Sequence, residues 1–204
     1  MSQLKLTADG GGGTVSLKGP ASTTGNAAIE LTVPGTASGT LAVGDTGKIL
    51  QVVSTTKTDT SSFTSNGTDT FVDLSGMSVS ITPTAASSKI LIQFYVSVAV
   101  STGTVHVRLV RGSTPIAVGD SASNRLQSTV ARRSMSSVYG LECTPMSMSF
   151  LDSPNTTSAT TYKLQGTAGS SYNATYYVNR SDSDTDADYA ARVASSITVM
   201  EVAA

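Results

Sequence analysis

Residues 89–112, KILIQFYVSVAVSTGTVHVRLVRG, decide which kind of fold this chain adopts. The second half alternates, with Val105, Val107 and Leu109 on one face of an extended chain and polar residues on the other. The first half, 89–100, is nearly continuous in apolar residues. That pattern predicts a strand at the centre of a β core, or one packed between a sheet and a neighbouring subunit.

Similar short apolar stretches follow one another along the rest of the chain, separated by turn residues. The expected strands are 48–56, 71–83, 89–100, 104–112, 114–120, 124–134, 146–154, 160–169, 172–181 and 194–203. Their spacing is typical of an antiparallel sandwich rather than of alternating strands and helices, and no helix beyond a turn or two is expected. The sequence therefore predicts an all-β fold: an antiparallel jelly-roll sandwich over residues 48–204, preceded by an extended β arm.

The arm, residues 1–47, is rich in Gly, Thr and Ala and contains a weak internal repeat. LTADGGGGTV at 6–15 resembles LTVPGTASGTL at 31–41, and each copy has the pattern strand, glycine-rich turn, strand. An isolated hairpin is marginally stable in water. We therefore expect the arm to lie against copies of itself in an oligomer or against another protein, and interpret it as an attachment and trimer-building segment.

The glycines of the arm do not form a nucleotide-binding motif. Gly10–Gly13 are followed by a segment that reads as a strand, whereas a phosphate-binding loop opens into a helix. The segment GDTGKIL at 44–50 has Ile49 where a phosphate-binding loop needs Ser or Thr. Both segments are therefore interpreted as turns.

The composition excludes several classes of protein. The 204 residues include 13 basic and 14 acidic side chains, a balance that provides no electrostatic footprint for nucleic acid. Ser and Thr make up about 30% of the chain, which favours strands and turns over helices. The N-terminus lacks the apolar segment of a signal peptide, and the run 90–100 is too short to span a bilayer. We expect a protein made in a cytoplasm, without membrane insertion.

The single histidine and the single cysteine argue against a zinc site and against internal disulfides, and no cofactor is expected. His106 shares its strand face with Thr104 and Arg108, and no local residue completes a catalytic arrangement, so a half-exposed strand histidine is expected. Cys143 follows Glu142, whose charge would raise the thiol pKa, and is expected to be a small buried residue.

The segment SDSDTDADY at 181–189 places carboxylates at every second position: Asp182, Asp184, Asp186 and Asp188. Calcium could use such oxygen ligands, although Ala187 and Val193 stand where an EF-hand loop beginning at Asp182 needs Gly and Glu. A solvated acidic loop is the alternative.

YNATYY at 172–177 is the one aromatic cluster; it suits recognition of sugar or protein, or equally a sandwich surface or subunit interface. A polysaccharide-cleaving site would need two carboxylates in a cleft, usually beside aromatic side chains. The available carboxylates are Glu142, Asp152 and the cluster at 182–188, but the chain has no Trp and few Phe. We therefore expect no enzyme.

Several phrases of the sequence resemble a β domain of bacteriophage tail-fibre and other virion-surface proteins. They are SVSITPTAASSKILIQFYVSV (78–98), VRLVRGSTPIAVGD (107–120), SFLDSPNTTSATTYKLQ (149–165), YVNRSDS (177–183) and SSITVMEV (195–202). The segment 4–35 also resembles the leading part of phage structural proteins. The resemblance implies a homotrimer of jelly rolls, similar in architecture to complement and tumour-necrosis-factor-like trimers, with no catalytic residues to transfer.

Together these observations predict a short trimeric tail fibre or spike on the virion surface. Residues 1–47 would bind other virion proteins, and the jelly roll would contact a polysaccharide or protein of the host surface. The residues expected in such a contact are Arg132, Arg133, Tyr172, Asp182, Asp184, Asp186 and Asp188. A trimeric capsid decoration protein that stabilises the shell is the alternative, and a polysaccharide depolymerase is a minor one.

Overall fold

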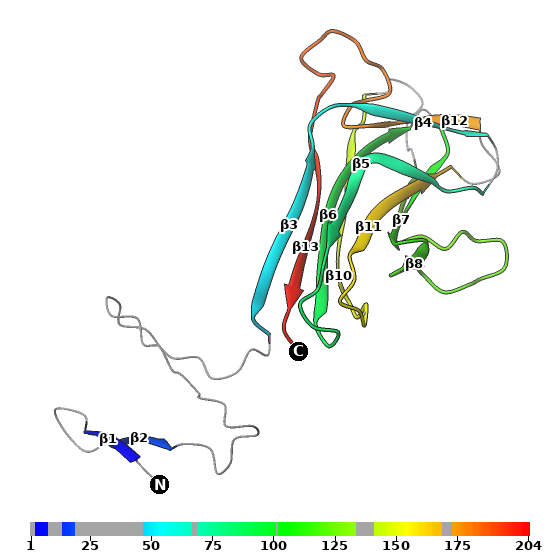
Figure 1. The fold of residues 1–204 in the computed structure, drawn as a ribbon. Helices are drawn as coiled ribbons and strands as arrows, with labels where there is room; N and C mark the ends of the chain where they lie inside the picture. Colours follow the sequence, from blue (N-terminus) through cyan, green and yellow to red (C-terminus); the bar gives the residue numbers. More distant parts are fainter. Residues whose placement is uncertain are drawn as a thin grey trace. The chain divides into compact units, whose positions relative to one another are not determined.

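The computed structural model describes residues 3–7, 14–18, 47–66, 69–100, 102–133, 141–168 and 173–204 (Figure 1). The chain divides into two units, residues 1–42 and 43–204. In the first unit, β1 (Gln3–Thr7) pairs antiparallel with β2 (Thr14–Lys18), as expected for the first copy of the repeat. Gly10–Gly13 and the second copy, 31–41, lie outside the described residues, and the predicted roles of the arm stay predictions.

The second unit, which we call the head, is an antiparallel β-sandwich of two sheets, and its described residues contain no helix. Its strands are β3 (Ile49–Lys57), β4 (Ser61–Asn66), β5 (Val72–Ile81), β6 (Lys89–Val100), β7 (Thr104–Arg111), β8 (Thr114–Ile116), β9 (Val130–Arg133), β10 (Thr144–Asp152), β11 (Thr160–Thr167), β12 (Asn173–Val178) and β13 (Ser195–Val202). The predicted all-β sandwich is confirmed. The described residues also contain no helix long and apolar enough to cross a membrane.

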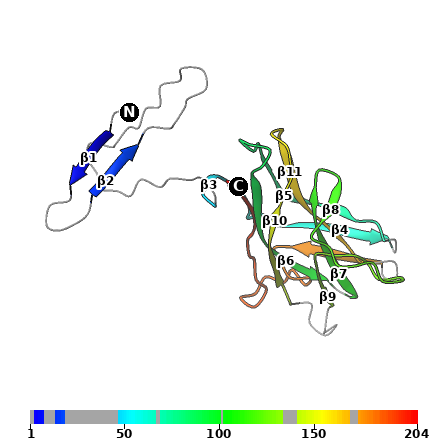
Figure 2. The same cartoon turned by 90° about the horizontal axis from the view of Figure 1, so that it is seen from below.

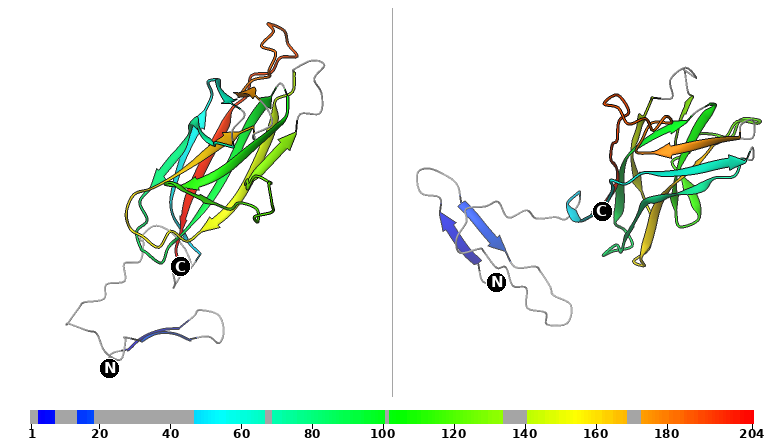
Figure 3. Two further views of the ribbon diagram at one scale, coloured as in Figure 1. Left: turned by 90° about the vertical axis from the view of Figure 1, so that its right-hand side faces the viewer. Right: turned by 90° about the horizontal axis from the view of Figure 1, so that it is seen from above.

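One sheet has six strands and the other has five. The order β3-β13-β6-β12-β4, with β10 on the other side of β6, makes up the six-stranded sheet. The order β5-β11-β7-β8, with β9 also paired to β7, makes up the five-stranded sheet. The chain passes repeatedly from one sheet to the other, as in a jelly roll, so the two layers in Figures 2 and 3 are built from interleaved segments.

Strand β6 is the centre of the six-stranded sheet, as the apolar run 89–100 predicts. It pairs with β13 and β12 along one edge and with β10 along the other. Every second side chain of β6, from Ile90 to Val100, is buried between the sheets. Opposite it lie Val105, Val107 and Leu109 of β7, all fully buried on the face that their alternation predicts.

Two parts of the strand prediction are wrong. The segment SSFTSN forms β4, although its single apolar residue, Phe63, gives no alternating pattern to detect. Residues 117–129 form a loop rather than parts of two strands, because β8 ends at Ile116 and Ala117 takes a positive φ of 52°. Only Val130–Arg133 of the predicted strand 124–134 is extended in a ladder.

The head has two distinct ends. At the proximal end, Gly47 N donates to Ala203 O (2.7 Å) and Ala203 N donates to Lys48 O (2.9 Å), so the chain enters the head beside its C-terminal strand. At the distal end, β6 finishes at Val100 and β9 finishes at Arg133. The loop 179–194, coloured orange to red, projects from this distal end (Figures 1 and 3).

Candidate interaction surfaces

Three buried polar networks use residues of the phrases that carry the resemblance. In the first, both carboxylate oxygens of Asp152 accept a hydrogen bond from Nη1 of Arg111 at 2.8 Å, and the hydroxyl of Tyr162 donates to the same carboxylate at 2.7 Å. Burial raises the pKa of Tyr162, and its hydrogen bond to Asp152 raises it further. The three residues come from three different strands, so the network joins β7, β10 and β11.

The second network surrounds Glu201, which is fully buried at the proximal end. One carboxylate oxygen accepts hydrogen bonds from the backbone N–H and the hydroxyl of Thr84, both at 2.7 Å, and the other accepts one from Nε2 of Gln51 at 2.6 Å. Burial raises the pKa of this carboxyl, but the hydrogen bonds from Gln51, Thr84 and Ser88 lower it more and hold it at about 2. Glu201 is therefore a satisfied structural anion.

The third network is centred on Asn179, which adopts a left-handed backbone conformation with φ of 64°. Its side-chain amide donates to the carbonyl oxygens of Lys57 (2.8 Å) and Asp59 (3.0 Å), and its Oδ1 accepts a hydrogen bond from Ser195 Oγ at 2.5 Å. Ser195 Oγ in turn accepts one from the backbone of Ser97. These bonds fasten the loop 179–194 to the ends of three strands. In all three networks the polar residues of the phrases stabilise the fold.

The outer face of the six-stranded sheet carries three rows of directly opposed residues from β3, β13, β6 and β10. The first row is apolar: Val52, Met200, Leu91 and Leu151. The second is Ser54, Thr198, Gln93 and Ser149, and the third is Thr56, Ser196, Tyr95 and Ser147. We call these twelve residues the uncharged face, because none of them carries a charge.

Large apolar side chains of the uncharged face are open to solvent in the single chain. Val52 is 57% exposed, Leu151 48% and Tyr95 43%. The polar row is satisfied within itself, since Ser54 and Thr198 share a hydrogen bond of 2.8 Å and Gln93 donates to Ser149 at 3.1 Å. Such a face does not require a charged partner, and its apolar side chains can be buried against the uncharged surface of another protein.

The outer face of the five-stranded sheet is different in kind. Lys163 forms an ion pair of 2.7 Å with Asp73, and Asp73 also accepts a hydrogen bond from Gln165. Gln165 accepts one from Arg108, whose guanidinium lies 4.0 Å above the ring of Phe71. This face has the charged, self-paired chemistry of a surface kept in water.

Six of the seven residues expected in a host contact lie in or beside the distal end. Arg133 is exposed at the end of β9, and Arg132 is paired with Glu142. The acidic loop 179–194 projects at the same end of the head, although it is distant from both arginines in the sequence (Figure 3). Tyr172 lies outside the described residues. The expectation that these residues contact a host stays a prediction.

The four aspartates of the acidic loop do not converge on a common point. Asp184 is paired with two arginines, Arg192 at 2.6 Å and Arg180 at 3.6 Å. Arg180 also lies 3.9 Å above the ring of Tyr177. Among the described residues, no three His, Cys, Asp or Glu side chains are arranged to hold a metal ion. The loop is instead stabilised by arginines.

The aromatic cluster is divided between the core and the surface. Tyr176 is fully buried and stacks on Phe63 with ring centroids 4.7 Å apart, whereas Tyr177 faces Arg180. The exposed aromatic residue of this region is Tyr189, 59% exposed in the acidic loop. Nothing in the sequence distinguishes an exposed loop tyrosine of this kind from a buried one.

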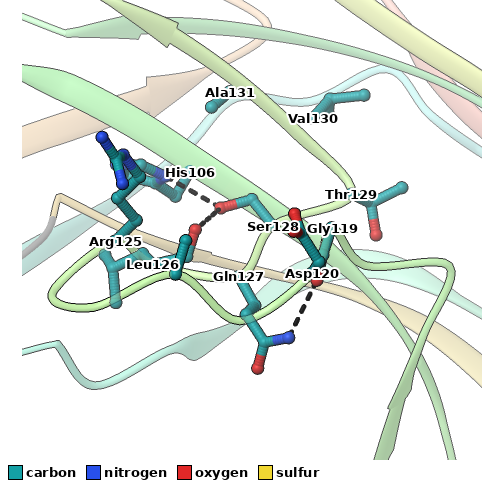
Figure 4. A pocket seen from close by; sticks show the side chains of 11 residues that line it. His106, Gly119, Asp120, Arg125, Leu126, Gln127, Ser128, Thr129, Val130 and Ala131 are labelled. Carbon is teal, nitrogen blue, oxygen red and sulfur yellow. Dashed lines mark hydrogen bonds between the residues drawn. The ribbon is translucent and has the colours of Figure 1, made fainter.

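A pocket of about 290 Å³ lies between β7, β9 and the loop 117–129. Figure 4 shows His106 and Ser128 joined by a hydrogen bond, with Nδ1 of His106 2.8 Å from Ser128 Oγ, while Gln127 reaches back to the carbonyl of Gly119. Burial lowers the pKa of His106, and the charge of Asp69 opposes this only in part, so the ring is neutral at pH 7. The loop residues were expected to be strands, so the pocket could not be anticipated.

The pairing of His106 with Ser128 does not form a catalytic triad. No described carboxylate is hydrogen-bonded to His106, and the hydroxyl of Ser128 is also directed at the carbonyl oxygen of Leu126, 3.5 Å away. A nucleophilic serine needs its imidazole to be held by a third group. Cys143 is half-buried, and burial raises the pKa of its thiol while Arg132 lowers it, so its environment does not activate it.

Comparison with known proteins gives a likeness of fold only. No protein-family model matches the chain, and no curated protein matches it. A chain in the structure of infectious bursal disease virus, Gt strain, aligns with a TM-score of 0.39 and 16% identity, covering 94% of this chain and 45% of that chain. The Gx strain of the same virus gives 0.32 and 16%, covering 98% and 46%.

A third structure, the crystal structure of an infectious bursal disease virus VP2 subviral particle, aligns with a TM-score of 0.31 and 14% identity. It covers 78% of this chain and 38% of that chain. This chain thus spans less than half the length of all three of these neighbours. At such TM-scores they assign it no role.

Proposed function

We propose that this chain is a non-enzymatic structural protein of a virion surface, a short homotrimeric tail fibre or spike. Residues 1–47 attach it to the particle, and the distal end of the head contacts the host surface. The virion assignment rests on the resemblance of the quoted phrases to bacteriophage virion-surface proteins. The proposed homotrimer is supported by the uncharged face of the six-stranded sheet.

The two outer faces of the sandwich differ in charge. A solvated sheet face normally carries charges, as the five-stranded sheet does with Asp73, Lys163 and Arg108. The centre of a protein interface is instead depleted of charge and holds apolar and aromatic side chains. Copies of one uncharged face can meet without like-charge repulsion, and three copies of this head can turn that face toward a common axis.

The two ends of the head support the proposed orientation. The chain enters the head at Gly47, at the proximal end, so the head's connection to the proposed attachment segment begins there. The exposed Arg133 and Tyr189 belong to segments at the other end. A tail fibre or spike needs this separation between its attachment and its contact surface.

The first test is the mass of the full-length chain in solution by light scattering. We expect about 60 kDa, three times the 20.8 kDa of one chain. A mass equal to one chain at micromolar concentration would overturn the homotrimer. Cryo-electron microscopy of the virion then separates the roles: three-fold density on the tail supports the fibre, and density on the shell replaces it with capsid decoration. Release of reducing sugars from host envelope material would favour a depolymerase.

A further inference from the structure

The loop 117–129 is held over β7 as a pre-formed wall of the pocket beside His106. Gly119 N donates to Ser128 O at 3.1 Å, and Gln127 Nε2 donates to Gly119 O at 2.8 Å, which closes the loop at its base. Thr129 forms two hydrogen bonds to β7: its backbone N–H donates to Val107 O, and its hydroxyl oxygen accepts the backbone N–H of Leu109. A ligand would therefore meet a wall already in place, with little conformational entropy to lose.

Two opposite charges line this pocket without being paired to each other. Asp120 and Arg125 both lie in its wall, and neither forms a hydrogen bond or ion pair through its side chain with any described residue. Several other charged residues of the described head do have partners, as Asp73, Lys163 and Asp184 do. The charges in the pocket are thus available to a ligand.

The remaining lining supplies neutral groups. The imidazole of His106 is held through Nδ1 by Ser128, which leaves Nε2 for a ligand, and Gln127 keeps its Oε1 as an acceptor. Apolar surface comes from Leu126, Val130 and Ala131. With one acid, one base and a neutral imidazole, the pocket has no net charge, so it disfavours strongly anionic and strongly cationic ligands alike.

We propose that this pocket binds one sugar unit of a neutral polysaccharide, with Asp120 and Arg125 as the recognition pair. A carboxylate accepts hydrogen bonds from neighbouring hydroxyls, a guanidinium donates to hydroxyl oxygens, and an apolar patch covers the C–H side of the ring. The volume lies at the lower limit of small-molecule pockets, about 300 Å³, which suits a single hexose. The inference rests on the proposed function, in which the head contacts a host surface.

The test is a saturation-transfer NMR titration of the full-length chain with free glucose, galactose and N-acetylglucosamine, and with glucuronate as a charged comparison. Concentrations up to about 20 mM would nearly saturate a site with a Kd of about 1 mM. Arg125→Ala and Asp120→Asn remove the two recognition groups, and both residues are exposed, so the variants should fold. Arg133→Ala removes another exposed arginine, which does not line the pocket.

We expect at least one neutral hexose to bind, about tenfold or more weakly in Arg125→Ala and in Asp120→Asn, and unchanged in Arg133→Ala. Binding of glucuronate alone, equal loss in all three variants, or no signal from any neutral sugar with the folded protein would each overturn the inference. These outcomes are independent of the mass from light scattering, so a failure of the sugar site is distinguishable from a failure of the proposed homotrimer.

Discussion

Gly166 of β11 shows how closely the two sheets of the head approach each other. A Cβ at this position would lie 2.8 Å from Cζ of Phe63 and 3.1 Å from Cδ2 of Leu74. Both neighbours are packed in the core, and Phe63 is also stacked on Tyr176, so neither can move freely. A glycine in a strand often marks such a close approach.

We therefore expect Gly166→Ala to lower the free energy of unfolding by about 1–3 kcal/mol, the usual cost of overpacking a core. Chemical denaturation of the purified chain measures it. Gly119→Ala is the matched control, because the nearest atom to its new Cβ is 4.0 Å away and its backbone is not left-handed. Equal stability of the two variants would show that the region around Phe63 is loosely packed.

Glu201 predicts the behaviour of the head in acid. Its pKa is held at about 2 in the folded chain, against 4.5 for an ordinary glutamate, so the folded state binds this proton less readily than the unfolded state does. The stabilisation is complete above about pH 4.5 and is lost as the pH falls toward 2. In Glu201→Gln this dependence should disappear, with a constant loss of about 1–3 kcal/mol at pH 7 from the mismatched hydrogen bonds.

Thermal unfolding between pH 2 and pH 7 checks this prediction. The melting temperature of the unmodified chain should fall more steeply below pH 4.5 than that of Glu201→Gln. Parallel curves for the two proteins would mean that other carboxyl groups control acid unfolding.

At the residue scale, alternation in the sequence identified which side chains point inward. It correctly placed Val105, Val107 and Leu109 in the core and His106 on the other face. It could not reveal that His106 meets Ser128, since the two residues are joined only by the path of a loop. Nor did it show that Tyr176 is buried, because an aromatic residue suits a core and a surface equally.

At the scale of elements, the side chain of Asn179 fastens the base of the loop 179–194 to the neighbouring strands. Asn179 donates to two backbone carbonyls and accepts from Ser195, and it holds a left-handed backbone that Asn tolerates better than most residues. Asn179→Ala should lower the free energy of unfolding by about 2–4 kcal/mol. The substitution removes these hydrogen bonds and also leaves their buried partners unsatisfied. Asn155→Ala, at an exposed left-handed position, should cost under about 1 kcal/mol.

Hydrogen exchange locates the effect of Asn179→Ala. Faster exchange should be confined to the loop 179–194 and to the neighbouring ends of β3 and β12, while β11 in the other sheet stays protected. Uniformly faster exchange over the head would contradict the assignment of Asn179 as a local fastening.

Strands were predictable where one face is apolar and every second residue is buried, as in β7 and β13. Strand β4 was not predicted, because its side chains are mostly polar and show no alternation. It forms an antiparallel pair with β12 instead. Strands were also wrongly predicted within 117–129, where apolar residues such as Val118 and Leu126 belong to a loop. In both cases tertiary contacts, which no local pattern contains, determine the structure.

At the scale of the whole molecule, the uncharged face gives the sharpest prediction about assembly. Val52→Lys and Leu151→Lys each place a charge in its apolar row, at positions that are exposed in the single chain and so tolerant of lysine. If copies meet through this face, either substitution should convert the trimer to monomers at micromolar concentration, because a charge would be buried without a partner.

Light scattering of the variants checks it, with Ser80→Lys as the control on the outer face of the five-stranded sheet. The control should keep the mass of the unmodified protein. Retention of that mass by both Val52→Lys and Leu151→Lys would exclude the uncharged face from the contact between copies. The sequence indicated that β6 belongs to a core or an interface, but only the registers of β3, β13 and β10 show which rows are exposed.

The bonds that join Gly47 and Lys48 to Ala203 determine how the head bears a mechanical load. Strand β3 begins at the proximal end of the head and is held in its sheet by β13 alone, through an antiparallel ladder from Ile49 to Lys57.

A pull between residue 47 and the acidic loop runs along β3 and strains the whole ladder in shear. A pull between residues 47 and 204 opens the ladder one pair at a time. Single-molecule extension should therefore need more force for the first pair of attachment points, and equal forces would refute this. A host-bound head tethered by its arm would resist detachment in its strongest direction.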